Sequence, residues 1–447
     1  MSFLLIVDSC FTTTGSGKTK ENVSQTKFWF GSTSVCERIG EVEIPKKNRV
    51  DTNPFILMEL LDKQTIWQVR NSYLGVYVHF PYCFKKCDYC DFYSEGIGAA
   101  PANDEKLLFQ AYQKEILERK IHFPEIKNRT IDTVFFGGGT PSKASSKSWK
   151  DFLNFLRSEF SFADDTEISI EVNPEDLSAE LLEEYDSIGI NRVNVGVQTL
   201  EPKGLEFLGR HYDSERYGAL VDVLTHSPIE RVGIDLMYGI PGVSKESFYR
   251  DLNLFLEAGL PHLSLYSLTL EKGTQYSRDV TDHKKREPEE NIQSEILTNL
   301  PVLLKEHGYL WYEVSNYAKP GFESRHNLKY WTYEPYLGIG PGAHGMIEGH
   351  RYGNPRNSSL YQKKPSNTKY EPADPSTELS LTLFRLFSPF RYLDFIDTYL
   401  DSESKIKYLR TIEGWDKKGL CSIESGVFQW KPAALLLLDD LILEISL

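Results

Sequence analysis

The chain has 447 residues, of which 26% are charged and 40% are hydrophobic, and its formal net charge is −14. This composition is typical of globular proteins and excludes a disordered or fibrous chain, and the length allows two or three domains or one large barrel with an appendage. The acidic balance argues against a general nucleic-acid-binding protein, and apolar runs such as residues 433–438 are far shorter than the ~20 residues that span a bilayer.

The first segment, residues 1–70, shows no sustained period of 2 or 3.6 and is expected to be a poorly patterned extension. Within it, an apolar run at 4–7 precedes Gly-Ser-Gly-Lys-Thr at 15–19. A phosphate-binding loop would need a glycine where Thr12 stands, so the resemblance to such a loop fails. Met58 lies just before the ordered pattern begins, and it is our candidate for the natural start of the protein.

A regular alternation of strand-like and helical patterns follows. Strands rich in Val, Ile, Phe and Tyr are predicted at residues 75–80, 133–136, 167–172, 192–197, 232–237 and 263–268. Helical spacing predicts one apolar face made of Trp149, Phe152, Leu153, Leu156 and Phe160, and another made of Leu107, Tyr112, Ile116 and Leu117. Because alternating strands and helices are typical of βαβ units, we predict an α/β fold with a partial (β/α)6 TIM-like barrel over residues 71–310.

The regularity fades after the barrel. Residues 311–354 are rich in aromatic residues, Gly and Asn and are expected to be loops, and the polar stretch 354–375 is expected to be a linker. We treat 311–375 as one segment. Residues 376–447 combine helical patterns with a short strand at 427–430 and are predicted to be a small α+β C-terminal module.

Glycines and polar residues lie where the predicted strands end. They are Gly137, Gly138, Gly139 and Thr140, then Glu171, Asn173, Gln198, Asp235, Tyr266 and Ser267. In a βα barrel the carboxyl ends of the strands and the loops after them build the active site. A single polar residue there is as often structural as functional, but so many at the same level favour a site.

Three of the 6 cysteines, Cys83, Cys87 and Cys90, fall within eight positions directly after the first strand. A structural zinc site usually draws its four ligands from two separated pairs, and a second pair is missing. A redox pair of Cys87 and Cys90 leaves Cys83 without a role. Three thiolates on one loop suit a [4Fe–4S] cluster with one iron open to a small molecule. With no secretory signal visible, we expect a reducing, cytoplasmic compartment.

This cysteine spacing, followed by a Gly-rich strand end, resembles the radical S-adenosylmethionine (SAM) superfamily. More narrowly, the chain resembles the oxygen-independent coproporphyrinogen III oxidase-like family. The motifs that carry this resemblance are Tyr-Val-His-Phe-Pro-Tyr-Cys at 77–83, Phe-Gly-Gly-Gly-Thr-Pro-Ser at 136–142, Glu-Val-Asn-Pro at 171–174, Gly-Val-Gln-Thr at 196–199, Leu-Gly-Arg-His at 208–211 and Asp-Leu-Met-Tyr-Gly-Ile-Pro-Gly at 235–242. The resemblance implies a [4Fe–4S] cluster whose open iron is chelated by SAM.

The same resemblance implies which residues contact SAM: Tyr77, Tyr89, Gly138, Gly139, Thr140, Glu171, Gln198, Arg210 and Asp235. Their chemistry agrees with that ligand. Glycines let the backbone approach closely, Glu171 and Asp235 can offset the positive charge of SAM, and Arg210 can bind its carboxylate in bidentate fashion. An isolated Tyr77 or Tyr89 would more often be a core aromatic.

Within this family, one position favours the HemW branch of haem chaperones. The oxidases proper carry a fourth cysteine two places after the third, where this chain has Phe92. A second motif of that branch, His-Asn-x-x-Tyr-Trp, matches residues 326–331. The resemblance implies haem contact by His326, Tyr330 and Trp331, although a lone loop histidine is more often simply hydrogen-bonded.

We therefore expect a cytoplasmic haem chaperone that holds a [4Fe–4S] cluster, SAM and haem. Its expected partners are haem-accepting proteins and an electron donor for the cluster, with membrane contact only through acceptors and no nucleic acid. The alternative is an oxygen-independent coproporphyrinogen III oxidase, which decarboxylates two propionates to give protoporphyrinogen IX. A third, weaker hypothesis is radical-based modification of RNA or protein, against which the acidic balance argues where RNA is concerned.

Overall fold

The computed structural model describes residues 67–70, 72–96, 102–210 and 217–446. The P-loop-like stretch and the candidate start at Met58 lie outside the described residues. All six predicted barrel strands are confirmed; the first five have wider bounds than predicted, and the sixth is shifted by one residue. They are β1 (Tyr73–Phe80), β4 (Thr130–Gly138), β5 (Ser161–Val172), β6 (Arg192–Gln198), β7 (Arg231–Tyr238) and β8 (His262–Ser267).

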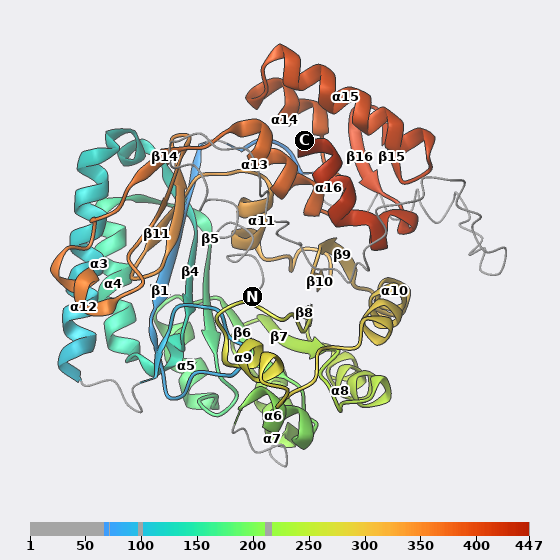
Figure 1. Ribbon diagram of the computed structural model, residues 1–447. Helices are drawn as coiled ribbons and strands as arrows, with labels where there is room; N and C mark the ends of the chain where they lie inside the picture. The colour runs from blue at the N-terminus through green and yellow to red at the C-terminus, as the bar shows by residue number, and fades with distance from the viewer. Residues whose placement is uncertain (1–66, 71, 97–101, 211–216, 447) are drawn as a thin grey trace.

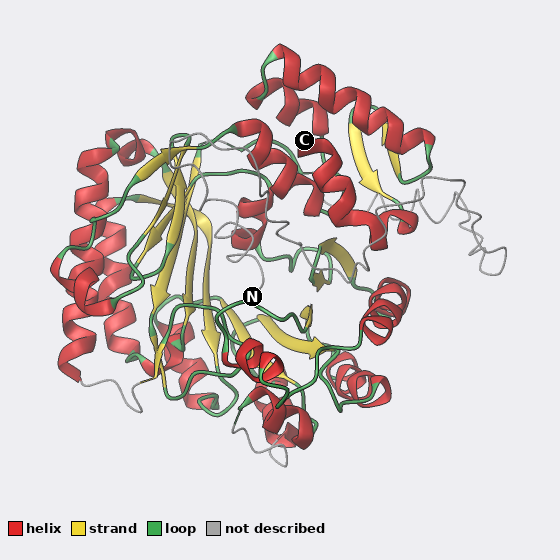
Figure 2. Cartoon of the chain, in the orientation of Figure 1, coloured by secondary structure: helices red, strands yellow, loops and turns green. Residues whose placement is uncertain are grey.

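These six strands stand side by side in chain order, and every neighbouring pair is parallel. Parallel neighbours need a crossover connection, which is usually helical. The helices that follow the strands lie outside the sheet (Figures 1 and 2): α3 (Ala102–His122), α4 (Ser146–Glu159), α5 (Ala179–Ser187), α6 (Pro202–Leu208), α7 (Tyr217–Thr225), α8 (Lys245–Glu257), α9 (Gln275–Thr281) and α10 (Glu290–Glu306). The sheet remains open, with β14 and β9 at its two edges, so the barrel is partial as predicted.

The predicted helix faces are right for α4 and partly wrong for α3. The side chains of Trp149, Phe152, Leu153 and Leu156 are buried on α4, whose N-cap Ser145 accepts from the backbone N–H of Ser148. On α3, Tyr112 and Ile116 are buried, but Leu107 and Leu117 are 50% and 43% exposed. The buried side of α3 instead includes the ion pair of Glu115 and Arg119. Among the described residues, no helix combines the length and apolar character needed to cross a membrane.

The segment expected to be loops and a linker instead extends the sheet at both edges. Next to β8 it adds β10 (Asn316–Ala318) and β9 (Leu310–Glu313). Beside β1 it adds β11 (Tyr336–Ile339), β12 (His344–Ile347), β13 (His350–Gly353) and β14 (Tyr370–Pro372), of which β11 is parallel to β1. It also contains two short helices, α11 (Arg325–Trp331) and α12 (Ser358–Lys363). Residues 354–375 are therefore packed structure and not a free linker.

The C-terminal part has α+β secondary structure, and the strand predicted at Val427–Trp430 is confirmed as β16. It pairs with β15 (Cys421–Glu424) in a separate two-stranded sheet, and the remaining elements are α13 (Pro375–Thr382), α14 (Tyr392–Tyr399), α15 (Ser402–Lys417) and α16 (Leu438–Ser446). Its apolar side chains belong to the same continuous core as those of the barrel. The module lies at the end of the molecule where β1 begins, away from α6 and α9 (Figure 1).

Candidate functional site

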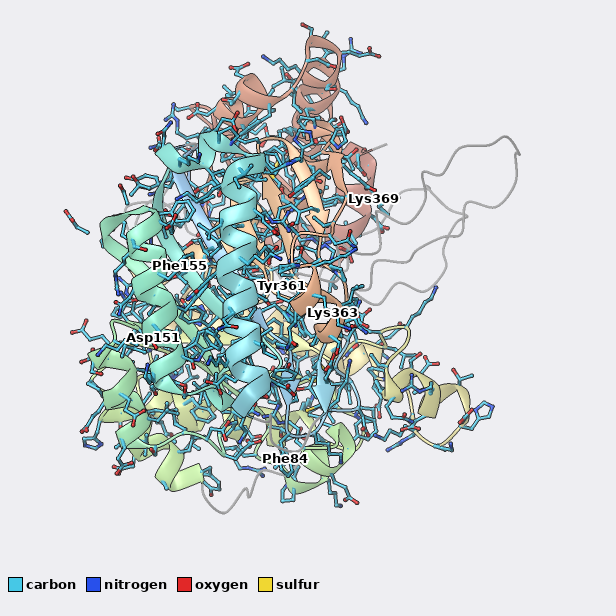
Figure 3. The ribbon with its side chains drawn as sticks, turned by 90° about the vertical axis from the view of Figure 1, so that its left-hand side faces the viewer. Phe84, Asp151, Phe155, Tyr361, Lys363 and Lys369 are labelled. Atoms are coloured by element: carbon cyan, nitrogen blue, oxygen red, sulfur yellow. The ribbon has the colours of Figure 1, made fainter. Side chains whose placement is uncertain are left out.

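The three clustered cysteines lie on the loop after β1, at the carboxyl end of the parallel strands. Cys83 ends the short strand β2 (Tyr82–Cys83), and the backbone N–H of Cys90 donates to the carbonyl of Cys87 at 3.2 Å. All three side chains line one pocket. Phe84 points outward beside them, at the end of the molecule opposite the C-terminal module (Figure 3). The fold thus brings the three predicted cluster ligands to one place.

The chemistry of these thiols suits a cluster better than the alternatives. In the described part of the chain, no three His, Cys, Asp or Glu side chains converge closely enough to hold one metal ion. A cubane cluster binds each thiolate through a different iron, so its ligands are spread more widely than those of a single zinc ion. Burial, and then the neighbouring Cys87, raises the pKa of Cys90 to about 12, so that metal binding at this thiol releases a proton.

The same pocket gathers most of the residues predicted to contact SAM. Its cavity volume is about 110 Å³, in a hollow that is open to solvent. Its lining includes Tyr89, Gly138, Gly139, Thr140, Glu171, Gln198, Arg210 and Asp235. The fold therefore places together eight of the nine residues that the resemblance implied, with Tyr77 as the exception. Of the strand-end residues, Gly137, Tyr266 and Ser267 do not line this pocket.

Two glycines at the end of β4 allow the cysteine loop to pack against that strand. A side chain on Gly139 would place its Cβ 2.7 Å from the carbonyl oxygen of Tyr82, next to Cys83. Gly138 has φ +109°, a left-handed conformation that favours glycine, and a Cβ there would contact the ring of His79 at 2.7 Å. These glycines are needed for the packing below the loop as well as for close approach to a ligand.

Buried acceptors without partners face the pocket. Oε1 of Gln198 and Oδ1 of Asp235 have no hydrogen-bond partner, although both side chains are at least nine-tenths buried. Gln198 also has φ +69°, in the left-handed region that costs a non-glycine residue strain. Buried unpaired acceptors and strained backbone are both concentrated at ligand sites. A ligand with ammonium, hydroxyl and amino donors, such as SAM, would satisfy these acceptors.

Burial raises the pKa of two carboxyl groups in the pocket. Burial, and then the negative charge of Asp235, raises the pKa of Glu171 to about 7, while a hydrogen bond from the backbone N–H of Gly138 opposes the shift. Burial also raises the pKa of Asp235. A cationic ligand between them would favour their ionised forms.

Arg210 connects the cysteine loop to the end of β5. Its Nη2 donates to Oδ1 of Asn173 at 3.3 Å, its Nη1 lies 4.0 Å from Sγ of Cys87, and Asn173 in turn donates to Oγ1 of Thr140. Asn173 lines the pocket but is absent from the residues that the sequence predicted to contact SAM. The sequence had placed Asn173 only among the polar residues at strand ends, directly after the strand that carries Glu171.

Tyr77 lies one layer below the pocket and does not line it. Its hydroxyl is hydrogen-bonded to Nδ1 of His79 at 3.0 Å, and Nε2 of His79 bonds to the carbonyl oxygen of Tyr93 at 2.7 Å. Burial lowers the pKa of His79 to about 4, so its imidazole is neutral. Tyr77 therefore supports the end of the cysteine loop from inside the barrel.

The histidine of the motif predicted to contact haem is buried, and both of its ring nitrogens are hydrogen-bonded. His326 has no exposed surface, and its Nδ1 and Nε2 are hydrogen-bonded to the hydroxyls of Thr133 at 2.8 Å and Tyr330 at 2.9 Å. Its backbone N–H donates to Oε1 of Glu167. Burial lowers the pKa of His326 well below its usual value. A neutral imidazole offers one donor and one acceptor, and both are occupied by protein groups here.

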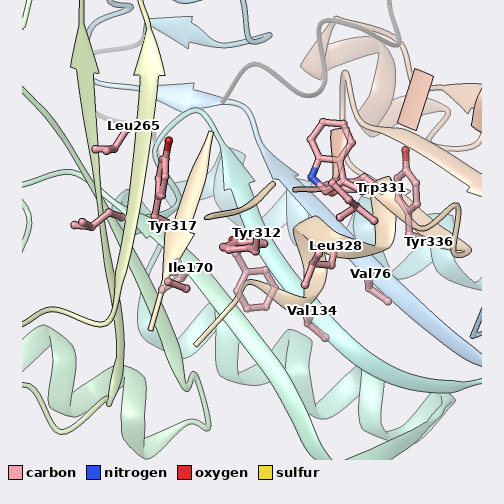
Figure 4. Close-up of a cluster of buried hydrophobic side chains, with 14 of the residues drawn as sticks. Val76, Val134, Ile170, Leu265, Tyr312, Tyr317, Leu328, Trp331 and Tyr336 are labelled. Carbon is pink, nitrogen blue, oxygen red and sulfur yellow. The ribbon is translucent and has the colours of Figure 1, made fainter. Parts of the chain in front are cut away.

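The last four residues of α11 are also buried and close the barrel interior near the C-terminal module. Trp331 and Leu328 pack among strand residues such as Tyr312 and Val134 (Figure 4). Lys329 is 2% exposed at its side chain and pairs with Asp132 at 2.7 Å and with Glu334 at 2.8 Å. In this conformation the motif does not join the pocket at the strand ends.

The chain is similar in sequence to a known superfamily and to named bacterial proteins. A model of the radical SAM superfamily matches residues 77–255. A protein of Buchnera aphidicola subsp. Acyrthosiphon pisum named "Heme chaperone HemW" is 34% identical over 328 residues, which cover 71% of this chain and 84% of that protein. The protein of the same name from Escherichia coli K12 is 32% identical over 332 residues, or 72% of this chain and 85% of that protein.

Among solved structures, the radical SAM enzyme coproporphyrinogen III oxidase (HemN) from Escherichia coli has a similar fold. The TM-score is 0.68 with 21% sequence identity, and the match covers 87% of this chain and 93% of that one. At this identity the likeness bears on the fold alone.

Proposed function

Because the chain belongs to the HemW family of the radical SAM superfamily, we propose that it is a haem chaperone that holds a [4Fe–4S] cluster and SAM and passes haem to acceptor proteins. The observation that carries this proposal is the identity of about one third to curated haem chaperones across most of their length. Phe92, in place of the fourth cysteine of the oxidases, supports the same choice.

For the cofactors, we propose that Cys83, Cys87 and Cys90 hold the cluster and leave one iron for SAM. When bound, the reduced cluster supplies the electron that cleaves SAM. Support comes from the shared pocket, in which Arg210 can bind the carboxylate of SAM while Glu171 offsets its positive charge. The proposed SAM contacts are eight of the nine residues predicted from the sequence. The ninth, Tyr77, does not line the pocket and is proposed to support the cysteine loop through His79.

SAM affinity should depend on the ionisation of Glu171. Its pKa of about 7 in the ligand-free protein falls when a cation binds, so binding releases a proton and the affinity rises with pH until the carboxyl is already ionised. Below pH 7 the dissociation constant should increase towards ~10-fold per pH unit, as expected for one coupled proton. Calorimetry between pH 5.5 and 8.5 measures this. Glu171→Gln should flatten the profile, whereas Glu175→Gln, on the same pocket, should preserve it; an unchanged slope in Glu171→Gln contradicts the assignment.

For haem, we propose contact with the segment that carries His326, Tyr330 and Trp331, in a state in which α11 has left its buried position. Both ring nitrogens of His326 are hydrogen-bonded, so iron could be ligated only after at least one of these bonds is broken. A closed motif that opens at a cost lowers the apparent haem affinity. Weak binding is what a protein that gives haem away requires.

A single assay separates this function from that of a coproporphyrinogen III oxidase. The protein with its cluster intact is given SAM, a reductant and coproporphyrinogen III, and protoporphyrinogen IX is measured beside haem stoichiometry. We expect stoichiometric haem binding without protoporphyrinogen formation. Turnover to protoporphyrinogen would sink the chaperone proposal, and failure to bind haem at all would remove it as well.

We further propose haem-accepting proteins and an electron donor for the cluster as partners. The proposed compartment is the cytoplasm, because cluster ligands must stay reduced and the described cysteines, including Cys421, are all free thiols. Cell fractionation with an antibody against the chain tests the location. Pull-down of haem-loaded protein, compared with haem-free protein, tests whether acceptors bind preferentially to the loaded form.

A further inference from the structure

Asp88, which stands between the second and third cysteines, is held by three segments that are distant in sequence. Its backbone N–H donates to the carbonyl of Leu208 at 3.1 Å, and its carbonyl accepts from the N–H of Tyr276 at 2.7 Å. Its carboxylate Oδ2 accepts from Nζ of Lys285 at 2.6 Å. The proposed function described so far uses neither Asp88 nor Lys285. Asp88, however, is the residue directly after Cys87.

The ammonium of Lys285 is fixed by more than this carboxylate. It also donates to the carbonyl oxygen of Phe207 at 2.7 Å, and it lies 4.9 Å from the centre of the Phe207 ring. A second carboxylate, Asp279, is 3.8 Å away. The side chains of Lys285 and Asp88 are only 19% and 24% exposed. A partly buried cation with several acceptors holds its position far better than a surface pair does.

The contact between Asp88 and Lys285 also adjoins the turn that carries Arg210, the arginine proposed to bind SAM. Gly209, which directly precedes Arg210, has φ +70°, and a Cβ on it would lie 2.8 Å from Oδ1 of Asp88. The carboxylate therefore packs against the turn from which Arg210 leaves α6. Through Lys285 and Phe207, the end of α6 and the cysteine loop are joined to one cation.

We propose that the Asp88–Lys285 pair is a positioning latch, which holds the cysteine loop and the Arg210 turn at a fixed separation so that SAM can bind the cluster iron and Arg210 together. This inference rests on the proposed cluster and SAM binding and deepens it. Asp88 and Lys285 touch neither ligand and act through Cys87, Cys90 and Arg210. Outer residues that orient the ligands of a metal site typically change affinity or activity by ~10–100-fold when they are lost.

The test compares Lys285→Met with Lys284→Met in the full chain carrying its cluster. Lys284 is the adjacent lysine and pairs with Asp282 at 2.8 Å, but both side chains are largely exposed. We expect Lys285→Met to keep its iron and sulfide while its SAM affinity falls about tenfold, and to lose the change that SAM causes in the electron paramagnetic resonance spectrum of the reduced cluster. Lys284→Met should match the wild type, and Lys285→Arg should restore both signals.

Asp88→Asn provides a second route if Lys285→Met does not fold, because it removes the charge and keeps the shape. If Lys285→Met and Asp88→Asn have the same SAM affinity and the same spectrum as Lys284→Met, the latch proposal is wrong. The cluster and SAM proposals would remain intact. A wild-type protein that binds no cluster would instead refute the proposed cofactors, and the latch with them.

Discussion

Cys90→Ala is expected to abolish the cluster, with iron and acid-labile sulfide falling to background after anaerobic reconstitution. Three thiolates are the smallest ligand set that holds a [4Fe–4S] cluster with one open iron, and the loop offers no replacement. Within the described residues no fourth metal-binding side chain converges on the three cysteines. The loss of the cluster should also remove SAM binding, because the amino and carboxylate groups of SAM need the open iron.

The matched control is Cys421→Ala. Cys421 is a buried cysteine on β15 in the C-terminal module, on a strand that belongs to a separate sheet from the pocket. It should retain full iron and sulfide content, so that general damage from losing a thiol is excluded. Survival of the visible absorption of the cluster in Cys90→Ala would show that the ligand assignment is wrong. The melting temperature of each variant, measured without iron, separates cluster loss from unfolding.

The six strands of the barrel were predictable because each carries a short, mostly buried stretch rich in apolar residues, which in β5, β6 and β8 alternate with polar ones. Val76, Val134 and Ile170 show no exposed surface, as expected for parallel strands covered by helices. The short strands outside the barrel, such as β10 (Asn316–Ala318) and β12 (His344–Ile347), were missed. Strands of three or four residues with Asn, His or Gly carry too weak a period to be recognised.

The error on α3 has a different cause. Its buried face contains Glu115 and Arg119, which have no exposed side-chain surface and neutralise each other at 2.6 Å. Nε of Arg119 and the amide of Asn354 share the same carboxylate. A sequence pattern scores charged residues as exposed. The predicted apolar face therefore included the exposed Leu107 and left out the buried Glu115 and Arg119. Only the tertiary partners reveal that a charged pair belongs to the core.

The pocket residues were predictable to the extent that they are strand ends or motif cysteines. The latch residues were not, because the distance from Asp88 to Lys285 along the chain hides their contact. The same holds for His326: its motif could be recognised, but its burial depends on Thr133, which lies on another element. Local sequence indicates which chemistry is present, and only the fold decides which groups are already occupied.

His326→Ala should lower the free energy of unfolding by about 3 kcal/mol. The substitution removes a fully buried ring that stacks 5.3 Å from Phe135, and it removes the imidazole to which the hydroxyl of Thr133 is hydrogen-bonded. Cavity formation costs about 2–5 kcal/mol, and a lost buried hydrogen bond adds about 1–3 kcal/mol. Urea unfolding measures the loss, and His226→Ala, at a largely exposed position directly after α7, should be neutral.

The same variant decides whether His326 also ligates haem, provided that Tyr330→Phe is measured beside it. Tyr330→Phe removes the hydroxyl that occupies Nε2 of His326 and keeps the packing of the ring. If the imidazole binds iron once α11 opens, Tyr330→Phe should bind haem at least as tightly as the wild type, because one opposing bond is gone, whereas His326→Ala should lose the shift in haem absorption. Equal haem spectra and affinities for wild type and His326→Ala would restrict His326 to its structural role, since a destabilised barrel that still binds haem normally cannot be using that nitrogen as a ligand.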